Sequence, residues 1–184
     1  VKENKEPEKE VIKLPTTFAG KDRPIAVMID NNINAMPQAG LLEADLVYEI
    51  IVEGGETRMM AVLKGKDVEK IGPVRSSRHY FLDYALENDA IYVHFGWSPQ
   101  AESDISTMGV NNINGLYYDG SYFWRVSEKY APHNAVISTK NILKVAENNE
   151  YRTTSEQKPV LNYAADEIEL EDGKEAETIT IPYS

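Results

Sequence analysis

Two arginines flank a pair of hydroxyl residues just after a Gly-Pro dipeptide. Residues 71–79 read IGPVRSSRH, with Arg75 and Arg78 on either side of Ser76 and Ser77. We expect the serines to cap a following helix, whose first amides carry partial positive charge. An arginine fork matches a phosphate or a carboxylate with two parallel hydrogen bonds. This segment therefore predicts an anion-binding site.

The same two arginines also fit a purely structural role. Arg75 and Arg78 can pair with the protein's own carboxylates, for which Asp83, Glu53 and Asp45 are the candidates. Arginines at the start of a helix commonly tie that helix to its neighbours, and such pairs add little stability at a surface. On the sequence alone, the anion site and the internal tie stay open as alternatives.

The histidines offer a second set of candidate functional residues. His94 ends an apolar run and lies two residues before Gly96, so it faces a cleft or is a hydrogen-bonded core histidine, the more frequent case. His133 and Asn134 follow a proline, where they either lock a loop through backbone hydrogen bonds or face a ligand. His79, beside an arginine, is the weakest of the three histidine candidates.

The spacing of acids and histidines does not specify a metal site. The three histidines are scattered and lack zinc-site spacing. Magnesium or calcium prefers oxygen ligands, and a solvated sheet face explains the available carboxylates equally well. Those carboxylates are Asp30, Asp45, Glu49 and Glu53. Neither a nucleophile elbow nor a nucleotide-binding glycine motif is present. We therefore predict no metal site and identify no cofactor.

Residues 111–125 form a segment rich in aromatic and amide side chains. Exposed, such side chains suit stacking on sugar rings, whereas buried ones are simply core. We expect about half of these aromatic side chains to belong to the core.

The elements that position these residues alternate between strands and helices. Strands are predicted at 25–29, 46–52, 57–63, 90–95 and 135–137, and helices from Ser76 or Ser77 to Leu86, from Ser98 to about Met108, and from Ser138 to about Asn148. Gly54-Gly55 predicts a hairpin, which argues against a purely parallel sheet. The pattern indicates an α/β layered domain with a mixed parallel and antiparallel sheet and flanking helices. Polar residues follow strand ends, where such sheets place their sites.

Composition limits the functions that remain. The 184 residues are 42% hydrophobic and 27% charged, which is enough apolar material for a core. No cysteine is present, which removes disulfides, thiolate metal sites and cysteine nucleophiles. With 19 basic and 30 acidic residues the net charge is −11, so we expect no nucleic-acid partner. Residues 11–146 carry only −3 of that charge. No apolar stretch approaches the roughly 18 residues needed to cross a bilayer.

Several motifs taken in order resemble the YerB-like family of lipoproteins from Gram-positive bacteria, which is built on a domain of unknown function. They are RPIAVMIDN (23–31), ADLVYE (44–49), EGGETR (53–58), IGPVRSSR (71–78), YVHFG (92–96) and APHN (131–134). The resemblance covers residues 20 to about 150. It implies an extracytoplasmic domain tethered to the outer face of the cell membrane through a lipidated N-terminal cysteine that lies outside this chain. Residues 1–19 are then a charged linker from the anchor, 20–152 the main domain, and 153–184 the start of a truncated C-terminal domain.

Two classes of function follow. The favoured one is a binding module for an anionic envelope ligand or a protein partner; the alternative is an envelope hydrolase or transferase acting on a phosphorylated or glycan substrate. The anion candidates are Arg58, Arg75, Ser76, Ser77 and Arg78, with a supporting polar cluster of Asp30, Glu53, His94, His133 and Asn134. In the enzyme, the arginines hold the anion, and Asp30, Glu53 or His94 acts as acid, base or metal ligand. Catalytic residues stay unassigned.

Overall fold

The fold is known from a computed structural model that describes residues 13, 15–166, 173, 177–178 and 180. Most of the linker predicted at 1–19 lies outside the described residues, as does much of the segment predicted to start a further domain at 153–184.

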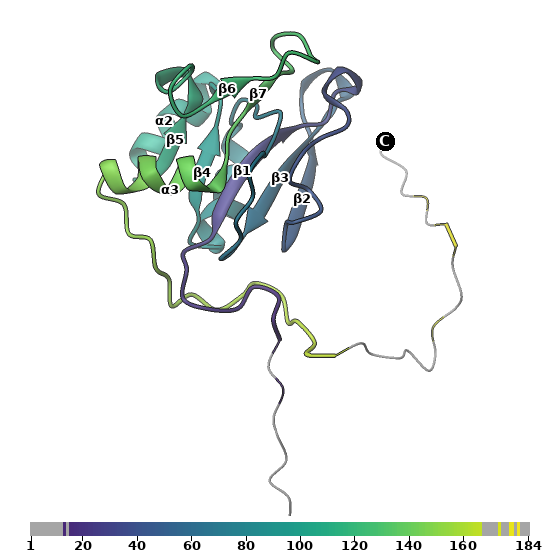
Figure 1. The fold of residues 1–184 in the computed structure, drawn as a ribbon, viewed down its shortest axis with the longest axis vertical. Helices are drawn as coiled ribbons and strands as arrows, with labels where there is room; N and C mark the ends of the chain where they lie inside the picture. The colour runs from purple at the N-terminus through teal and green to yellow at the C-terminus, as the bar shows by residue number, and fades with distance from the viewer. Residues whose placement is uncertain (1–12, 14, 167–172, 174–176, 179, 181–184) are drawn as a thin grey trace, which may run out of the picture.

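The centre of the domain is a five-stranded mixed sheet (Figure 1). Its strands are β1 (Ile25–Asp30), β2 (Leu46–Ile51), β3 (Thr57–Leu63), β4 (Ile91–His94) and β5 (Asn112–Asn114). They are arranged in the order β2-β3-β1-β4-β5. β1, β4 and β5 run parallel, while β3 is antiparallel to both β1 and β2. The predicted α/β fold with a mixed sheet is confirmed, including the hairpin at Gly54-Gly55.

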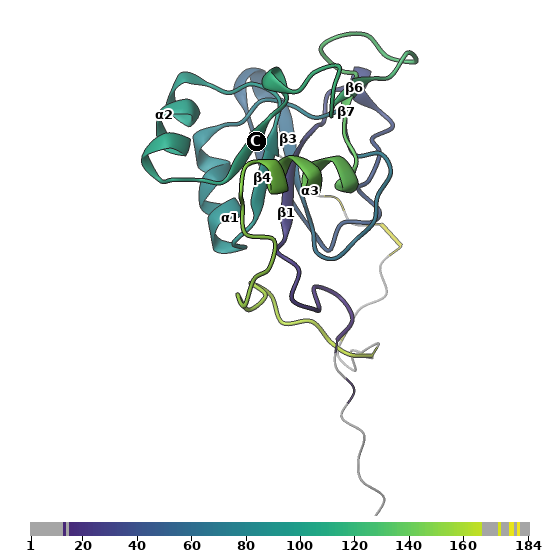
Figure 2. The same cartoon turned by 60° about the vertical axis from the view of Figure 1, so that its left-hand side comes forward.

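Both faces of the sheet are covered at its centre, whereas Val47 and Ile51 of the edge strand β2 are exposed. One face packs Val27, Ile29 and Leu63 against the helix α3 (Thr139–Asn148). The other packs Met28 and Met60 toward α1 (Leu82–Glu87) and α2 (Pro99–Thr107). Figures 1 and 2 show this arrangement, with α3 on one face and α1 and α2 toward the other. A small second sheet pairs β6 (Trp124–Arg125) with β7 (Ala135–Val136).

Two of the three predicted helix starts are confirmed and one is wrong. The side chains of Ser98 and Ser138 accept hydrogen bonds from the first-turn amides of α2 and α3, as N-caps do. Neither Ser76 nor Ser77 caps α1. A 3-10 turn, η3 (His79–Phe81), comes first and has no side-chain cap. Shorter 3-10 turns are η1 (Ile33–Ala35), η2 (Glu53–Gly55) and η4 (Gly115–Tyr117).

The two serines are used elsewhere because the chain around them is extended. Ser77 is buried, its backbone bridges Trp97, and its hydroxyl accepts a hydrogen bond from the Tyr92 hydroxyl at 2.9 Å. The Ser76 hydroxyl donates to the Phe95 carbonyl at 3.0 Å. Helix-end amides therefore do not contribute to an anion site at these serines.

Residues beyond 152 pack against the main domain at their start. The amide of Ser155 donates to the Lys21 carbonyl, and the Ser155 hydroxyl donates to Asp89 at 2.6 Å. Farther along, the Tyr163 ring stacks on Phe18 with centroids 6.0 Å apart. The first described part of 153–184 is therefore held by contacts with Phe18 and with residues in the range 20–152.

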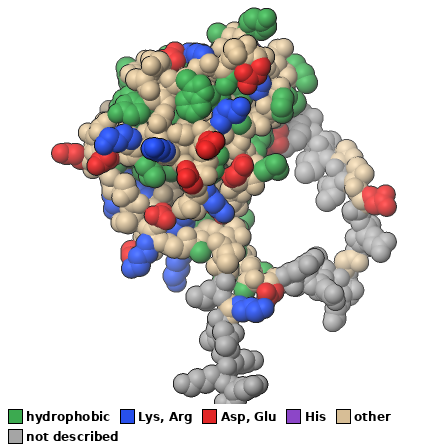
Figure 3. Space-filling view, in the orientation of Figure 1, with side chains coloured by type: hydrophobic (Ala, Val, Ile, Leu, Met, Phe, Trp, Pro, Cys, Tyr) green, Lys and Arg blue, Asp and Glu red, His purple; other side chains and the backbone are tan. Residues whose placement is uncertain are grey.

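Charged side chains are interspersed on the molecular surface. The face seen in Figure 3 carries acidic and basic side chains side by side, without a broad patch of one sign among the described residues. Of the helices that the described residues form, none is both long and apolar enough to cross a membrane.

Candidate functional site

The candidate site lies at the carboxyl end of β1, where the strand delivers Asp30. This carboxylate is only 4% exposed, although it ends a strand next to a polar loop. In the antiparallel register of β1 and β3, Asp30 lies opposite Arg58. The Asp30 amide also donates to the Pro73 carbonyl at 2.9 Å, which brings the segment containing Arg75 alongside β1. Three distant parts of the chain therefore meet at one strand end.

Asp30 is the centre of a buried ionic cluster. Its Oδ2 lies 2.7 Å from His133 Nδ1 and 3.1 Å from Arg75 Nε, and its Oδ1 accepts from the Asn32 amide at 3.0 Å. The Arg75 Nε–H does not point at the carboxylate, so that contact is an ion pair without a hydrogen bond. A buried carboxylate needs such compensation, because burying an unpaired charge is very unfavourable.

Arg58 is the buried cation of the site. It is 6% exposed, and its Nη1 donates to the Ser76 carbonyl at 2.6 Å. Among the described residues it has no carboxylate within salt-bridge distance. Burial lowers the pKa of Arg58, and the nearby positive charges of Arg78 and Arg75 lower that pKa further. Three guanidinium groups thus gather where two carboxylates, Asp30 and Glu53, are present.

Arg78 pairs with a carboxylate at the protein surface. Its Nε lies 2.7 Å and 3.0 Å from the two carboxylate oxygens of Glu53, whose side chain is 66% exposed. The hydrogen bond from Arg78 holds the pKa of Glu53 below its usual value. This is one of the internal pairs that the structural alternative named, whereas the partner of Arg75 is Asp30.

His94 and Asn134 do not join the arginines. The His94 ring is fully buried, with Nδ1 2.8 Å from the Gly96 carbonyl and Nε2 3.0 Å from Asn112 Oδ1. Burial lowers the pKa of His94, which favours a neutral, hydrogen-bonded core histidine. Asn134 accepts from Arg125 at 2.9 Å and donates to the Lys129 carbonyl, as a loop lock does.

The carboxylates considered as metal ligands accept hydrogen bonds or form ion pairs within the protein. Asp45 accepts from the amides of Phe18 and Lys64, and Glu49 accepts from Asn31 and Thr57. Within the part of the chain that the structure describes, no three histidine or acidic side chains gather as a metal site would require.

Lys129 is a positioning residue that sequence reasoning missed. Its Nζ donates to the carbonyls of Ala35 and Pro37, both at 2.6 Å, and burial lowers its pKa. These bonds join the loop containing His133 to the loop after β1. No local pattern links position 129 to position 35, so only the structure reveals this contact.

Fold and site define a three-layer α/β domain with a buried arginine–carboxylate cluster at the end of its first strand. The chain belongs to the family described as the N-terminal domain of a protein of unknown function (DUF3048), whose profile matches residues 14–152. This finding confirms the family resemblance.

Two comparisons concern a relative from Bacillus subtilis (strain 168). The chain is 41% identical over 144 residues to the protein named "Putative lipoprotein YerB", covering 78% of this chain and 44% of that protein. It also resembles the crystal structure of YerB from Bacillus subtilis, with a TM-score of 0.76 and 39% identity over 82% of this chain and 54% of that one. The chain thus spans about half the length of these relatives.

Proposed function

We propose that this domain is a binding module of a membrane-tethered lipoprotein and that it holds an anionic group of the cell envelope at Arg58, Arg75 and Arg78. The observation that carries the proposal is the imbalance of charge at the end of β1. Three guanidinium groups lie beside two carboxylates, and Arg58 has a backbone partner but no carboxylate partner among the described residues. An anion that approaches these groups balances the remaining positive charge.

The extracytoplasmic location is part of the same proposal. It is supported by the name of the Bacillus subtilis relative, which describes a lipoprotein. On this proposal residues 1–19 span the distance from the anchor, and 153–184 lead into a further domain. A single envelope-facing module of this kind requires no catalytic group.

Glu53 gives this proposal a sharp test because it competes with the ligand for Arg78. We expect Arg78→Ala to weaken the binding of inorganic phosphate about five- to tenfold, since one charged donor is lost. We expect Glu53→Gln to strengthen that binding about threefold, because the substitution releases Arg78 from its carboxylate. Amide chemical shifts recorded during a phosphate titration give the affinities.

Lys144→Ala is the matched control for net charge. Lys144 lies on α3, outside the arginine cluster, and pairs with Glu147. Its replacement therefore removes one positive charge without changing a residue of the cluster. Phosphate affinity should be the same in this variant and in the natural protein. The anion proposal is wrong if phosphate produces no saturable shifts at millimolar concentration, or if all three substitutions change the affinity alike.

The contact between His133 and Asp30 favours a second candidate, an enzyme acting on a phosphate ester. A carboxylate that orients an imidazole through one ring nitrogen leaves the other nitrogen free for acid–base catalysis. His133 Nδ1 lies 2.7 Å from Asp30, and Nε2 has no hydrogen-bond partner among the described residues. We expect no hydrolysis of p-nitrophenyl phosphate above the protein-free rate. If the protein does hydrolyse this ester and His133→Asn does not, the enzyme hypothesis replaces the binding-module hypothesis.

A further inference from the structure

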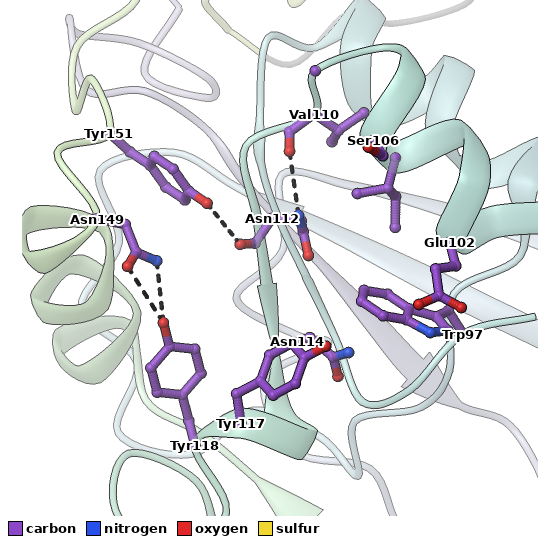
Figure 4. Close-up of a pocket in the computed structure, with 12 residues that line it drawn as sticks. Trp97, Glu102, Ser106, Val110, Asn112, Asn114, Tyr117, Tyr118, Asn149 and Tyr151 are labelled. Atoms are coloured by element: carbon purple, nitrogen blue, oxygen red, sulfur yellow. Dashed lines mark hydrogen bonds between the residues drawn. The ribbon is translucent and has the colours of Figure 1, made fainter.

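A separate hollow lies over the edge strand β5, outside the arginine cluster. Its volume is about 720 Å³, within the range of small-ligand sites. Figure 4 shows that Trp97 and Glu102 approach it from the side of α2, while Tyr118 and Asn149 approach it from the side of α3. Neither the arginines nor Asp30 line it. A ligand here therefore meets different chemistry from that at the end of β1.

Two aromatic rings form a corner of this hollow. The rings of Trp97 and Tyr117 have centroids 6.2 Å apart and are inclined at 69°. Trp97 is half-buried and lies 5.4 Å from the ring of buried His94, so it is fixed against the core. Tyr117 is 71% exposed. A fixed ring beside an exposed one provides an apolar surface that a ligand can cover.

Asn114, which lines the hollow, adds an unused hydrogen-bond donor. The residue is 2% exposed, and its Oδ1 accepts from the amides of Gly96 at 2.9 Å and Leu116 at 3.1 Å. These two donors fix the orientation of the side-chain amide, because the opposite orientation would place its NH₂ against two N–H groups. Its Nδ2 is buried and has no hydrogen-bond partner among the described residues, an unfavourable state that an acceptor oxygen would relieve.

Three further polar groups at the hollow have free hydrogen-bonding capacity, whereas Asn112, Tyr118, Asn149 and Tyr151 are already hydrogen-bonded. The Trp97 indole N–H, the Tyr117 hydroxyl and the Glu102 carboxylate have no hydrogen-bond partner in the described part of the chain. Figure 4 shows Glu102 and Trp97 among the side chains that line the hollow. Among the described residues that line the hollow there is no lysine or arginine, and Glu102 is the only carboxylate. This charge disfavours an anion and favours a neutral ligand with many hydroxyl groups.

We propose that this hollow binds a neutral saccharide. A pyranose ring has an apolar C–H face that suits Trp97 and Tyr117, and hydroxyl groups that can accept from Asn114 Nδ2 and donate to Glu102. The aromatic composition of 111–125 suggests that this segment suits stacking on sugar rings. The proposal assigns that role to Tyr117 together with Trp97, and adds Asn114 as a hydrogen-bond donor. It is independent of phosphate binding at the arginines, and a domain with both sites holds two chemically different ligands.

The test uses the trisaccharide of N-acetylglucosamine and cellotriose as probes, observed through the side-chain N–H signals of the protein. We expect saturable shifts of the Trp97 indole and Asn114 amide signals with at least one probe, and no shift of the Trp124 indole. Tyr117→Ala should weaken saccharide binding about five- to tenfold, because half of the stacking surface is lost. Its phosphate titration should not change.

Tyr130→Ala is the matched control, since Tyr130 is 88% exposed and does not line the hollow. Its saccharide affinity should equal that of the natural protein. The proposal is overturned if neither trisaccharide shifts the Trp97 signal, or if Tyr117→Ala and Tyr130→Ala bind alike. It is also overturned if tetramethylammonium shifts Trp97 while both saccharides fail to do so, because the corner is then a cation site.

Discussion

Replacing Asp30 with alanine is expected to lower the free energy of unfolding by about 3–5 kcal/mol, because removal of one partner leaves buried charge uncompensated. Asp30 is 4% exposed and is the carboxylate that contacts Arg75 and His133. Arg58, opposite it in the sheet, is also buried. Urea denaturation followed by circular dichroism measures the change.

Glu53→Ala is the control for this substitution, since it removes a carboxylate that pairs with an arginine at the surface. The Glu53 side chain is 66% exposed, so the loss should stay below about 1 kcal/mol. Asp30→Asn keeps an oxygen that can accept from the Asn32 amide but removes the charge. Asp30→Asn should therefore lower the free energy of unfolding by most of the amount that Asp30→Ala does. Equal losses for Asp30→Ala and Glu53→Ala would contradict a central role for Asp30.

The strands β1 to β4 were predictable because each is rich in apolar residues and has clear ends. Buried strands such as β1 and β4 need apolar side chains on both faces, and this requirement is visible in the sequence. For the segment containing β5 the sequence allows either irregular structure or short strands, since only the middle of the three strand residues is apolar. In the structure the side-chain amides of Asn112 and Asn114 bond to His94 and Gly96. The start of α1 was misplaced because local capping preference at Ser77 is overridden by a buried contact with Tyr92.

The candidate site was predictable in its residue types but not in its pairings. Arg75, Asp30 and His133 became candidates because they lie at turns and strand ends, which are local features. Their mutual contacts join positions that are 103 residues apart in the case of His133 and Asp30, and no local pattern encodes such a distance. The Asn114 donor was equally hidden, because it is unpaired only once the amides of Gly96 and Leu116 occupy its oxygen.

Gly72 positions the segment that contains Arg75 against the loop that contains His133. Its amide and carbonyl both bond to Ala39, and two residues later the Val74 amide donates to the Ala135 carbonyl at 2.7 Å. At Gly72 φ is +137°, a backbone conformation that residues other than glycine rarely adopt. An added Cβ would lie 2.8 Å from Val74 N and 2.9 Å from Ala135 O, both rigid backbone atoms.

Gly72→Ala is therefore expected to lower the free energy of unfolding by about 3–5 kcal/mol, the combined effect of backbone strain and overpacking. Gly120→Ala is the control for a positive φ without close approach, since Gly120 has a φ of +76° and no described atom lies within 4 Å of the added Cβ. Its loss should be about 1–2 kcal/mol, the strain alone. Denaturant unfolding of both variants gives the comparison. If the two variants lose the same free energy of unfolding, backbone strain accounts for the whole loss. The close approach at Gly72 then does not hold the segments of Arg75 and His133 together.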